Sequence, residues 1–432
     1  MKIGIIGTGI SGNAAAWLLH KDHEITVFEK AGYVGGHSNT VSVDGHPDID
    51  TGFIVYNEWT YPNLIALFDH LGVETVKTDM SFAVSANHGK LEYSGEHVFA
   101  QITNVFKPHY YKMLADLLRF YKTAPEFLDN PNPELSLNDY LTQNKYSKTF
   151  IHCHILPMAA AIWSTGKNDV GEFPAASFIR FFVNHGLFHL KDRPQWWTVK
   201  GCSRQYVEKL TAGFKDRILT DTGVTAIHRD KDGVTVIDTN STKHRFDQII
   251  IATHSDEALA LLDDASEQEK SVLGAFPYSM NTAYLHTDAR LMPYRRKVWS
   301  SWNYMTTPED GQVCVSYWMN KLQPFIGEEQ DYFVTLNPPF EPAPEKTLKV
   351  IEYAHPMFTM SALDGWDKIS TIQGTNRTWF CGAWCGYGFH EDGISAGLAV
   401  AESVSGLKRP WDVTDKSPAG LNCTPEKVKN AA

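Results

Sequence analysis

The most restrictive feature of this sequence is a short apolar run that leads directly into a glycine-rich turn and then into a helix-forming run. The apolar run covers residues 3–6, the helix-forming run covers residues 13–20, and the turn between them is Gly7-Thr8-Gly9-Ile10-Ser11-Gly12. Gly7 permits a tight turn, Gly9 lets a phosphate approach the backbone, and Gly12 lets the helix pack closely on the strand. Because helix N-termini attract anions, the turn is predicted to hold the phosphates of a nucleotide.

A carboxylate at the end of the next predicted strand strengthens this prediction. Residues 24–28 form a second strand that leads into Glu29, twenty positions beyond Gly9, where a carboxylate can accept hydrogen bonds from both ribose hydroxyls. An acid at this position favours an unphosphorylated ribose. We therefore expect an α/β fold with a Rossmann-type domain that binds an adenine dinucleotide.

Length and charge exclude several classes of protein. At 432 residues the chain is too long for one hydrophobic core, so we expect two domains that share a cleft. No run of 18 uncharged apolar residues occurs, so a membrane-spanning helix is not expected. The formal net charge of -11 argues against a nucleic-acid partner, because phosphate neutralisation needs a basic face.

The cysteines and the start of the chain bear on the cellular compartment. The six cysteines lack the paired spacing of metal ligands, so we expect free thiols in a reducing compartment and no metal site. The first strand begins at Ile3 and leaves no room for a cleavable leader. The cytoplasm is therefore the expected location.

The residues that follow Glu29 make the sequence recognisable. Glu29 and Lys30 are followed, after four residues, by Gly35-Gly36-His37-Ser38. This resembles the superfamily of flavin amine oxidases, phytoene desaturases and protoporphyrinogen oxidases, in which the glycine doublet wraps the pyrophosphate of FAD. The resemblance implies that the cofactor is FAD. The superfamily usually has Arg after the doublet, where this chain has His37.

A second segment of the superfamily pattern lies beside the flavin ring. A predicted hairpin turns at Asp44-Gly45 and leads to Asp50-Thr51-Gly52. The superfamily places a similar Asp-x-Gly segment next to the isoalloxazine ring. By this resemblance Thr51, Gly52 and Phe53 are expected to contact the flavin.

Two later blocks complete the expected FAD site. Residues 218–253 read as a small strand meander, in which the resemblance implies that Val224 offers its backbone to the adenine and that the strand at 249–253 returns to the nucleotide-binding sheet. Residues 379–383 form an apolar strand that ends in Gly382-Ala383, and Asp392-Gly393-Ile394 follows. This resembles the closing FAD motif of the superfamily.

The closing motif predicts an electrostatic contact with the flavin. A helix that begins near Gly393 would aim its N-terminal amides at the ring and stabilise the negative charge of the reduced form. The superfamily usually has an acid where this chain has Trp384, although Asp392 offers a carboxylate nearby. Cys385 and His37 remain open as points of covalent attachment.

The three FAD blocks divide the chain into two discontinuous domains. Residues 1–80, 201–270 and 371–407 are expected to form the FAD-binding domain. Residues 81–200 and 271–370 are expected to form an α+β substrate domain, so that the topology is that of an amine oxidase. Residues 408–432 are interpreted as a C-terminal loop with a frayed end.

The substrate half carries a narrower resemblance, to bacterial FAD-binding proteins found alongside cyclopropane fatty acid synthases. The segments that carry it are residues 156–158, 161–164, 181–186, 193–201, 299–304, 316–320 and 334–338. This resemblance implies a lipid or fatty acyl substrate.

Two histidines are the candidate catalytic residues. His390 stands where many amine oxidases have an aromatic residue that cages the substrate amine, and His286 stands where they have a lysine that holds a water near flavin N5. Because histidine titrates near neutral pH, we expect His286 and His390 to face the flavin and transfer protons. The more common alternative for each is a surface histidine or a hydrogen-bonded core histidine.

The stretch from Val98 to Tyr121 has two interpretations. Apolar residues are interspersed with Lys107, Lys112, Arg119 and the adjacent Lys122, a pattern typical of a basic amphipathic pair of helices that rests on the inner face of a membrane. The alternative, which the sequence pattern favours, is a helix packed on the substrate domain.

The leading function is FAD-dependent oxidation or desaturation of an unsaturated, methyl-branched or cyclopropane-bearing fatty acyl chain by hydride transfer to flavin N5. The alternatives are a redox-neutral double-bond isomerase and an amine oxidase. A non-catalytic alternative is a flavin-binding partner subunit of a lipid methyltransferase. The sequence leaves the electron acceptor and the oligomeric state open.

Overall fold

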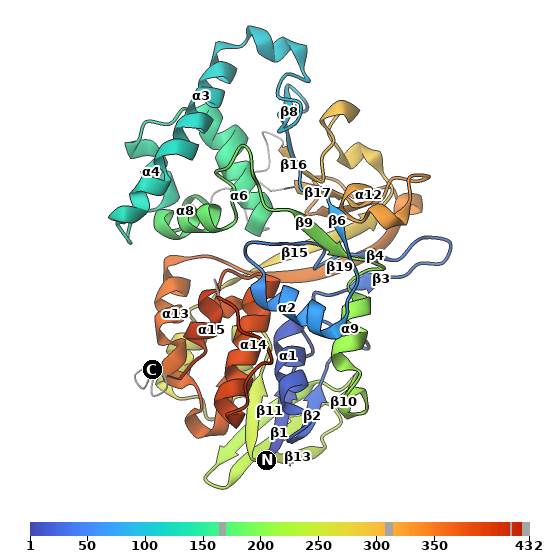
Figure 1. Ribbon diagram of the computed structural model, residues 1–432, viewed down its shortest axis with the longest axis vertical. Helices are drawn as coiled ribbons and strands as arrows, with labels where there is room; N and C mark the ends of the chain where they lie inside the picture. Colours follow the sequence, from blue (N-terminus) through green and yellow to red (C-terminus); the bar gives the residue numbers. More distant parts are fainter. Residues whose placement is uncertain (164–169, 307–313, 415–416, 426–432) are drawn as a thin grey trace.

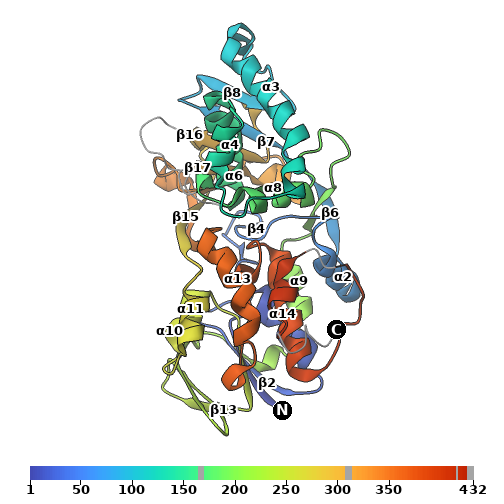
Figure 2. The same ribbon diagram turned by 90° about the vertical axis from the view of Figure 1, so that its left-hand side faces the viewer.

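A computed structural model describes residues 1–163, 170–306, 314–414 and 417–425, and it shows two halves stacked along the long axis (Figure 1). Ser164, part of one of the resembling segments, lies outside the described residues. The N-terminus lies at one end, close to the parallel strands, and a group of helices stands at the other end (Figures 1 and 2). Within the described ranges, no helix combines the length and hydropathy that crossing a bilayer requires.

The half that contains the N-terminus is built on a five-stranded parallel sheet. In spatial order its strands are β10 (Ile218–Leu219), β2 (Glu24–Phe28), β1 (Lys2–Ile6), β14 (Gln248–Ile251) and β20 (Thr378–Phe380). The central strands are buried and almost wholly apolar, as expected for a parallel sheet covered on both faces. The expected return of the 249–253 region to this sheet is confirmed, because Ile251 pairs with both Ile6 and Phe380.

Helices and a second small sheet cover this parallel sheet. The helices around it include α1 (Ile10–Leu19), α9 (Arg204–Thr211), α10 (Ser255–Leu261), α11 (Glu267–Leu273), α13 (Met360–Ile372) and α14 (His390–Ser405). The meander of β11 (Val224–Asp230), β12 (Gly233–Asp238) and β13 (Lys243–Phe246) contacts β1 and β14. The predicted α/β class with a Rossmann-type domain is confirmed.

The other half is built on a seven-stranded mixed sheet. In spatial order its strands are β19 (Thr347–Pro356), β15 (Tyr278–His286), β18 (Phe333–Leu336), β17 (Cys314–Trp318), β16 (Trp302–Thr306), β7 (Phe82–Ala86) and β8 (Leu91–Ser94). The helices of this half include α3 (Pro108–Thr123), α4 (Leu137–Gln143), α5 (Lys148–Phe150), α6 (Leu156–Trp163), α8 (Ala175–Asn184) and α12 (Met319–Leu322). The boundaries expected at residues 80, 200, 270 and 370 stay a prediction.

Two small sheets lie where the halves meet. One pairs β3 (Thr40–Val41) with β4 (Ile49–Asp50), and the predicted turn at Asp44-Gly45 closes through a bond from His46 N to Val43 O. The other joins β5 (Tyr56–Asn57), β9 (Trp196–Val199) and β6 (Thr75–Thr78), with α2 (Pro62–Leu71) between β5 and β6 along the chain. Segments far apart in the sequence are thereby held together beside the domain junction.

Glycines allow α1 and α14 to cross at backbone distance. A Cβ atom on Gly397 would lie 2.2 Å from the carbonyl oxygen of Ser11, and one on Gly393 would lie 2.6 Å from Cγ2 of Ile10. α14 begins at His390, so the expectation of a helix start near Gly393 is wrong by one turn. The Asp392 carboxylate fixes this start, because it accepts a hydrogen bond from the amide of Phe389 at 2.9 Å.

The described part of the C-terminal segment packs on the parallel-sheet half; residues 408–414 form the expected loop, and the end expected to be frayed, residues 426–432, lies outside the described residues. Trp411 stacks on Trp17 with ring centroids 5.5 Å apart, and Arg409 forms an ion pair with Glu402 at 2.9 Å. The short helix α15 (Pro418–Asn422) packs on α14 and buries Ala419. Apolar and aromatic contacts with α1 and α14 hold this loop and α15 against the domain.

Candidate functional site

A cavity of about 1700 Å³ runs between the two halves of the molecule. Pockets for one small ligand usually measure about 300–1,000 Å³, so this cavity has room for a dinucleotide and a second molecule. Fifteen of the residues predicted from the sequence line it: Gly7, Gly9, Ile10, Ser11, Glu29, Lys30, Gly36, His37, Thr51, Gly52, Phe53, Val224, Gly382, Ala383 and His390. The tertiary structure therefore brings the separate blocks to one cavity.

The glycine-rich turn forms a cradle that only glycine can provide. Gly7 has a φ of +97°, and a Cβ atom on Gly12 would lie 2.0 Å from the carbonyl oxygen of Gly7. By contrast, a Cβ atom on Gly9 would meet nothing within 4 Å, because Gly9 faces open cavity. α1 begins at Ile10 without any acid in its first turn, so its N-terminal amides remain available to an anion.

Glu29 is held rigidly at the cavity wall. Its carboxylate accepts hydrogen bonds from the amide of Thr8 at 3.0 Å and from the amide of Ala31 at 2.8 Å, and it also accepts one from the Thr8 hydroxyl. Glu29 nevertheless lines the cavity at the end of β2. This is the position from which a carboxylate can bind ribose hydroxyls.

The glycine doublet folds over the turn and places a histidine beside it. Gly36 has a φ of +57°, and its Cβ position lies 3.0 Å from the Cα of Gly9. The following residue, His37, is half-buried at the cavity wall, and its buried Nε2 has no hydrogen-bond partner among the described residues. An unpartnered buried nitrogen next to a glycine cradle fits a phosphate oxygen of a dinucleotide.

His37 belongs to a cluster of histidines that keep one another neutral. Its ring centroid lies 5.5 Å from that of His355 and 6.4 Å from that of His254, and it stacks on Tyr353 at 4.9 Å. Burial, and then the charges of His355, His254 and His390, lower the pKa of His37 to about 3. The imidazole is therefore neutral at pH 7 and carries one N–H that can point to a ligand.

His390 lies at the N-terminus of α14 and faces the cavity. Its ring stacks on Phe53 with centroids 3.8 Å apart, and its Nε2 lies 2.6 Å from the hydroxyl oxygen of Tyr206. The Tyr206 hydroxyl also contacts the hydroxyl of Ser38. Burial lowers the pKa of His390 to about 3, so the ring is neutral. The three groups form a continuous chain along which a proton can move.

The structure does not bring His286, the other candidate catalytic residue, to the cavity. His286 is fully buried in β15, where its Nε2 lies 2.7 Å from the Thr335 hydroxyl and its Nδ1 accepts a hydrogen bond from the amide of Asp288. Both ring nitrogens are thus used inside the mixed sheet. His286 is not among the described residues that line the cavity, so its position does not fit the expectation that it faces the flavin.

Six other predicted cofactor residues lie behind the cavity wall. They are Gly12, Gly35, Ser38, Asp392, Gly393 and Ile394. Asp392 accepts hydrogen bonds from the Phe389 amide and from the hydroxyl of Ser417, so it is a helix cap and does not replace the missing acid at Trp384. These residues shape the cavity by packing and capping.

Four histidines that the sequence did not single out also line the cavity: His154, His185, His254 and His355. His154 lies in a π-helical turn between α5 and α6, and its Nε2 is buried without a partner among the described residues. π-turns often occur at functional sites, but they cannot be read from composition. His185 lies within the resembling segment 181–186, but no pattern in the sequence assigns a role to any of these four histidines, so the fold is what brings them to the cavity.

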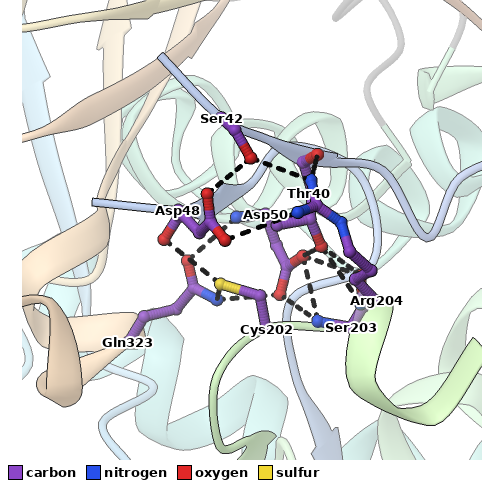
Figure 3. A network of polar contacts seen from close by, with 8 residues as sticks. All are labelled: Thr40, Ser42, Asp48, Asp50, Cys202, Ser203, Arg204 and Gln323. Atoms are coloured by element: carbon purple, nitrogen blue, oxygen red, sulfur yellow. Dashed lines mark hydrogen bonds and ion pairs between the residues drawn. The ribbon is translucent and has the colours of Figure 1, made fainter. Parts of the chain in front are cut away.

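A polar network around Asp50 joins the two halves beside the cavity (Figure 3). The buried carboxylate accepts hydrogen bonds from the amide and hydroxyl of Ser203, from the Thr40 hydroxyl at 2.7 Å and from the Gln323 amide at 2.8 Å. Burial raises the pKa of Asp50 to about 6, although these bonds oppose the rise. Since Thr51 and Gly52 follow directly, the network positions their part of the wall.

Comparison with known proteins gives a family match over most of the chain. A family model described as flavin containing amine oxidoreductase matches residues 10–324. The 4,4'-diapophytoene desaturase (4,4'-diaponeurosporene-forming) of Staphylococcus aureus strain Newman is 29% identical over 150 residues, which cover 29% of this chain and 30% of the desaturase. The chain thus matches less than a third of the length of this relative.

Solved structures match over almost the whole chain. The CLA-producing fatty acid isomerase from P. acnes has a TM-score of 0.63 at 16% identity, and the match covers 91% of this chain and 96% of the isomerase. Cyclohexylamine oxidase from Brevibacterium oxydans IH-35A has a TM-score of 0.66 at 17% identity, covering 93% and 99% of the two chains. At these identities the likeness shows a shared two-domain fold.

Replacing Asp50 by Ala tests the network at the domain junction. The change leaves four buried donors without their acceptor, and we expect the free energy of unfolding to fall by about 2–4 kcal/mol. Urea denaturation followed by tryptophan fluorescence measures the loss. The matched control is Asp48→Ala on the same hairpin, where an exposed ion pair should cost at most about 1 kcal/mol. Equal losses in the two variants would contradict the assignment.

The buried histidines predict loss of stability in acid. Burial lowers the pKa to about 3 or 4 in six of them: His37, His154, His185, His286, His355 and His390. The unfolded chain binds these protons near pH 6.5 and the folded chain does not, so stability should fall as pH drops from about 6.5 towards 4. Asp50, whose pKa is raised, works in the opposite direction.

Urea midpoints of the FAD-loaded protein between pH 7.5 and pH 5 measure this effect. The variant His185→Phe removes one of the six sites and should show a shallower decline. A midpoint that stays constant over this range would show that the histidines take up protons without unfolding.

Proposed function

This chain belongs to the flavin-containing amine oxidoreductase family and is an FAD-dependent oxidoreductase, and from that premise we propose that it oxidises or desaturates a fatty acyl chain. The observation that carries the proposal is the composition of the cavity beyond the glycine cradle. That region, called here the apolar arm, is lined mainly by apolar side chains, with His154, His185, Arg193 and Gln195 as its polar members; the apolar ones are Val98, Leu114, Leu117, Leu118, Tyr121, Met158, Ile162, Phe181, Leu187, Leu190 and Trp196. A long apolar ligand fits such a wall.

The residues of the cradle divide the work of holding the cofactor. We assign the ribose hydroxyls to Glu29 and the pyrophosphate to the amides at the start of α1 and the N–H of His37, while Thr51 to Phe53 line the same cavity. FAD supplies two-electron redox chemistry when bound. The N-terminus of α14 adds a positive dipole end beside the cavity.

We assign proton transfer to His390 and its partner Tyr206. His390 lines the cavity, and its neutral ring can relay a proton: one ring nitrogen takes it up while Nε2 releases its own proton to the hydroxyl oxygen of Tyr206. Ser38 extends this chain inward. The stacking of His390 on Phe53 fixes the ring orientation.

Two alternatives use the same cavity. A redox-neutral double-bond isomerisation is favoured by the fold shared with the P. acnes fatty acid isomerase and by the same apolar arm. Amine oxidation is the activity named for the cyclohexylamine oxidase, but His390 stands at the position where many amine oxidases have an aromatic residue. We also propose that the chain belongs to the narrower group of FAD-binding proteins found alongside cyclopropane fatty acid synthases. The proposed acyl chain is unsaturated, methyl-branched or cyclopropane-bearing.

Filling the apolar arm tests the substrate class. The variant Met158→Trp places a larger side chain in the arm, and we expect it to abolish anaerobic bleaching of the flavin by 16- or 18-carbon acyl substrates while FAD content stays unchanged. Product mass separates the outcomes, because desaturation lowers it by two hydrogens and isomerisation leaves it constant. The control is Met360→Trp on the exposed side of α13. If the protein releases peroxide with polyamines and acyl chains do not bleach the flavin, the activity is amine oxidation and the acyl-chain proposal is wrong.

Replacing His390 by Ala tests proton transfer. We expect the rate of flavin reduction by substrate to fall by roughly 100-fold or more, with a shifted pH profile, because positioned acid-base groups contribute about this much. His228→Ala, at an exposed position, is the control. FAD absorbance and affinity are measured in both variants to show that the site is intact. A reduction rate equal to that of the unmodified protein would remove His390 from the mechanism.

A further inference from the structure

The end of the molecule farthest from the parallel sheet exposes an unusual number of large apolar side chains. They lie before and along α3, which forms this end in both views (Figures 1 and 2). We call this surface the apolar tip, and its residues are Phe99, Ile102, Val105, Phe106, Tyr111 and Leu118. Phe106 is 82% exposed and Ile102 is 71% exposed, which is costly for a surface that faces only water.

The tip is rigidly constructed. The 3₁₀ turn η1 (Ile102–Phe106) is anchored by two buried amide side chains that point inward between the exposed residues. Asn104 donates a hydrogen bond to the carbonyl of Glu92, and Gln101 accepts one from the Glu92 amide at 2.8 Å. These bonds tie the turn to β8 and hold Ile102 and Phe106 outward. The exposure is therefore imposed by the fold.

The apolar tip is continuous with the apolar arm of the cavity. Leu118 is 54% exposed and also lines the cavity, and so does Leu190, which is 61% exposed. Leu114, Leu117 and Tyr121 on the same helix line the cavity from within. An acyl chain that entered beside Leu118 and Leu190 would meet these apolar side chains on its way from the tip to the arm, although His154, His185 and Arg193 line the same cavity.

The charge of this region is opposite to that of the whole chain. Between Val98 and Thr123 the basic residues are Lys107, Lys112, Arg119 and Lys122, and the single acid, Asp116, pairs with Arg119 at 2.9 Å. The chain as a whole has a formal net charge of -11. A basic, aromatic and apolar surface on an otherwise acidic protein is complementary to an anionic lipid bilayer.

We propose that the apolar tip docks on an anionic membrane surface and that the cavity mouth beside it takes its acyl chain directly from the bilayer. The proposal rests on the acyl substrate proposed above. Docking buries Ile102 and Phe106 in the headgroup region and brings Lys112 and Lys122 to the anionic headgroups. A protein partner on the same surface is the competing outcome, and the experiment separates the two.

Vesicle flotation of the FAD-loaded full-length protein tests the proposal. The vesicles are phosphatidylcholine alone, and phosphatidylcholine mixed with phosphatidylglycerol. We expect binding to the anionic vesicles that weakens in high salt, and roughly ten-fold or greater loss of binding for the double variant Ile102→Asp, Phe106→Asp. The double variant Lys112→Glu, Lys122→Glu should lose the preference for anionic vesicles.

The control is Leu421→Asp, an equally exposed apolar residue on α15 in the half that carries the parallel sheet, which should bind as the unmodified protein does. The flavin spectrum checks that each variant is folded. Failure of the unmodified protein to bind either vesicle, or equal loss in Leu421→Asp, overturns the docking and favours a protein partner. Flavin bleaching by a micellar acyl substrate needs no vesicle. If bleaching occurs without vesicle binding, the docking proposal fails and the proposed function stands; if bleaching is absent, the proposed function fails.

Discussion

The close approach of backbone to backbone around the N-terminus of α1 is the constraint on which the rest of this structure depends. Gly12 lies against the carbonyl of Gly7, and Gly397 of α14 lies against the carbonyl of Ser11. A side chain at either glycine would force α1 away from the sheet or from α14. Because α14 also carries His390 to the cavity, these contacts determine both the nucleotide cradle and the position of the proposed proton-transfer group.

The cavity has two parts, the polar cradle and the apolar arm, and the polar network around Asp50 fixes the wall beside them. The cradle is made of backbone amides, Glu29 and neutral histidines, whereas the apolar arm is made of leucines, methionine and aromatic rings. Asp50 joins β4 to Ser203 and Gln323, so the wall between these environments is fixed by a buried carboxylate. Preorganisation of this kind matters for hydride chemistry, since the reacting carbon must be held close to the cofactor while water is excluded.

Membership of the flavin-containing amine oxidoreductase family accounts for the cradle, but the family includes several chemistries. The distribution of apolar residues from the arm to the tip distinguishes this chain's proposed substrate class. The apolar tip, which lies beside the apolar arm, also carries basic residues. In our proposal this surface binds the lipid bilayer that contains the acyl substrate. The non-catalytic role considered from the sequence stays an alternative to the proposed activity, because the family match shows membership of the family and not a reaction.

The sequence by itself determined the elements whose function is local. The turn at Gly7 to Gly12 and the acid at Glu29 could be predicted because strand, turn and helix follow one another within thirty residues, and their spacing dictates where a phosphate and a ribose lie. Only the tertiary structure decided which histidines meet the cavity. His286 shares its residue type with His154 and His355, but the strand register buries it in the mixed sheet, while a π-turn and the end of β19 expose the others to the cavity. The packing of Trp411 and α15 likewise depends on partners distant in sequence, which no local pattern encodes.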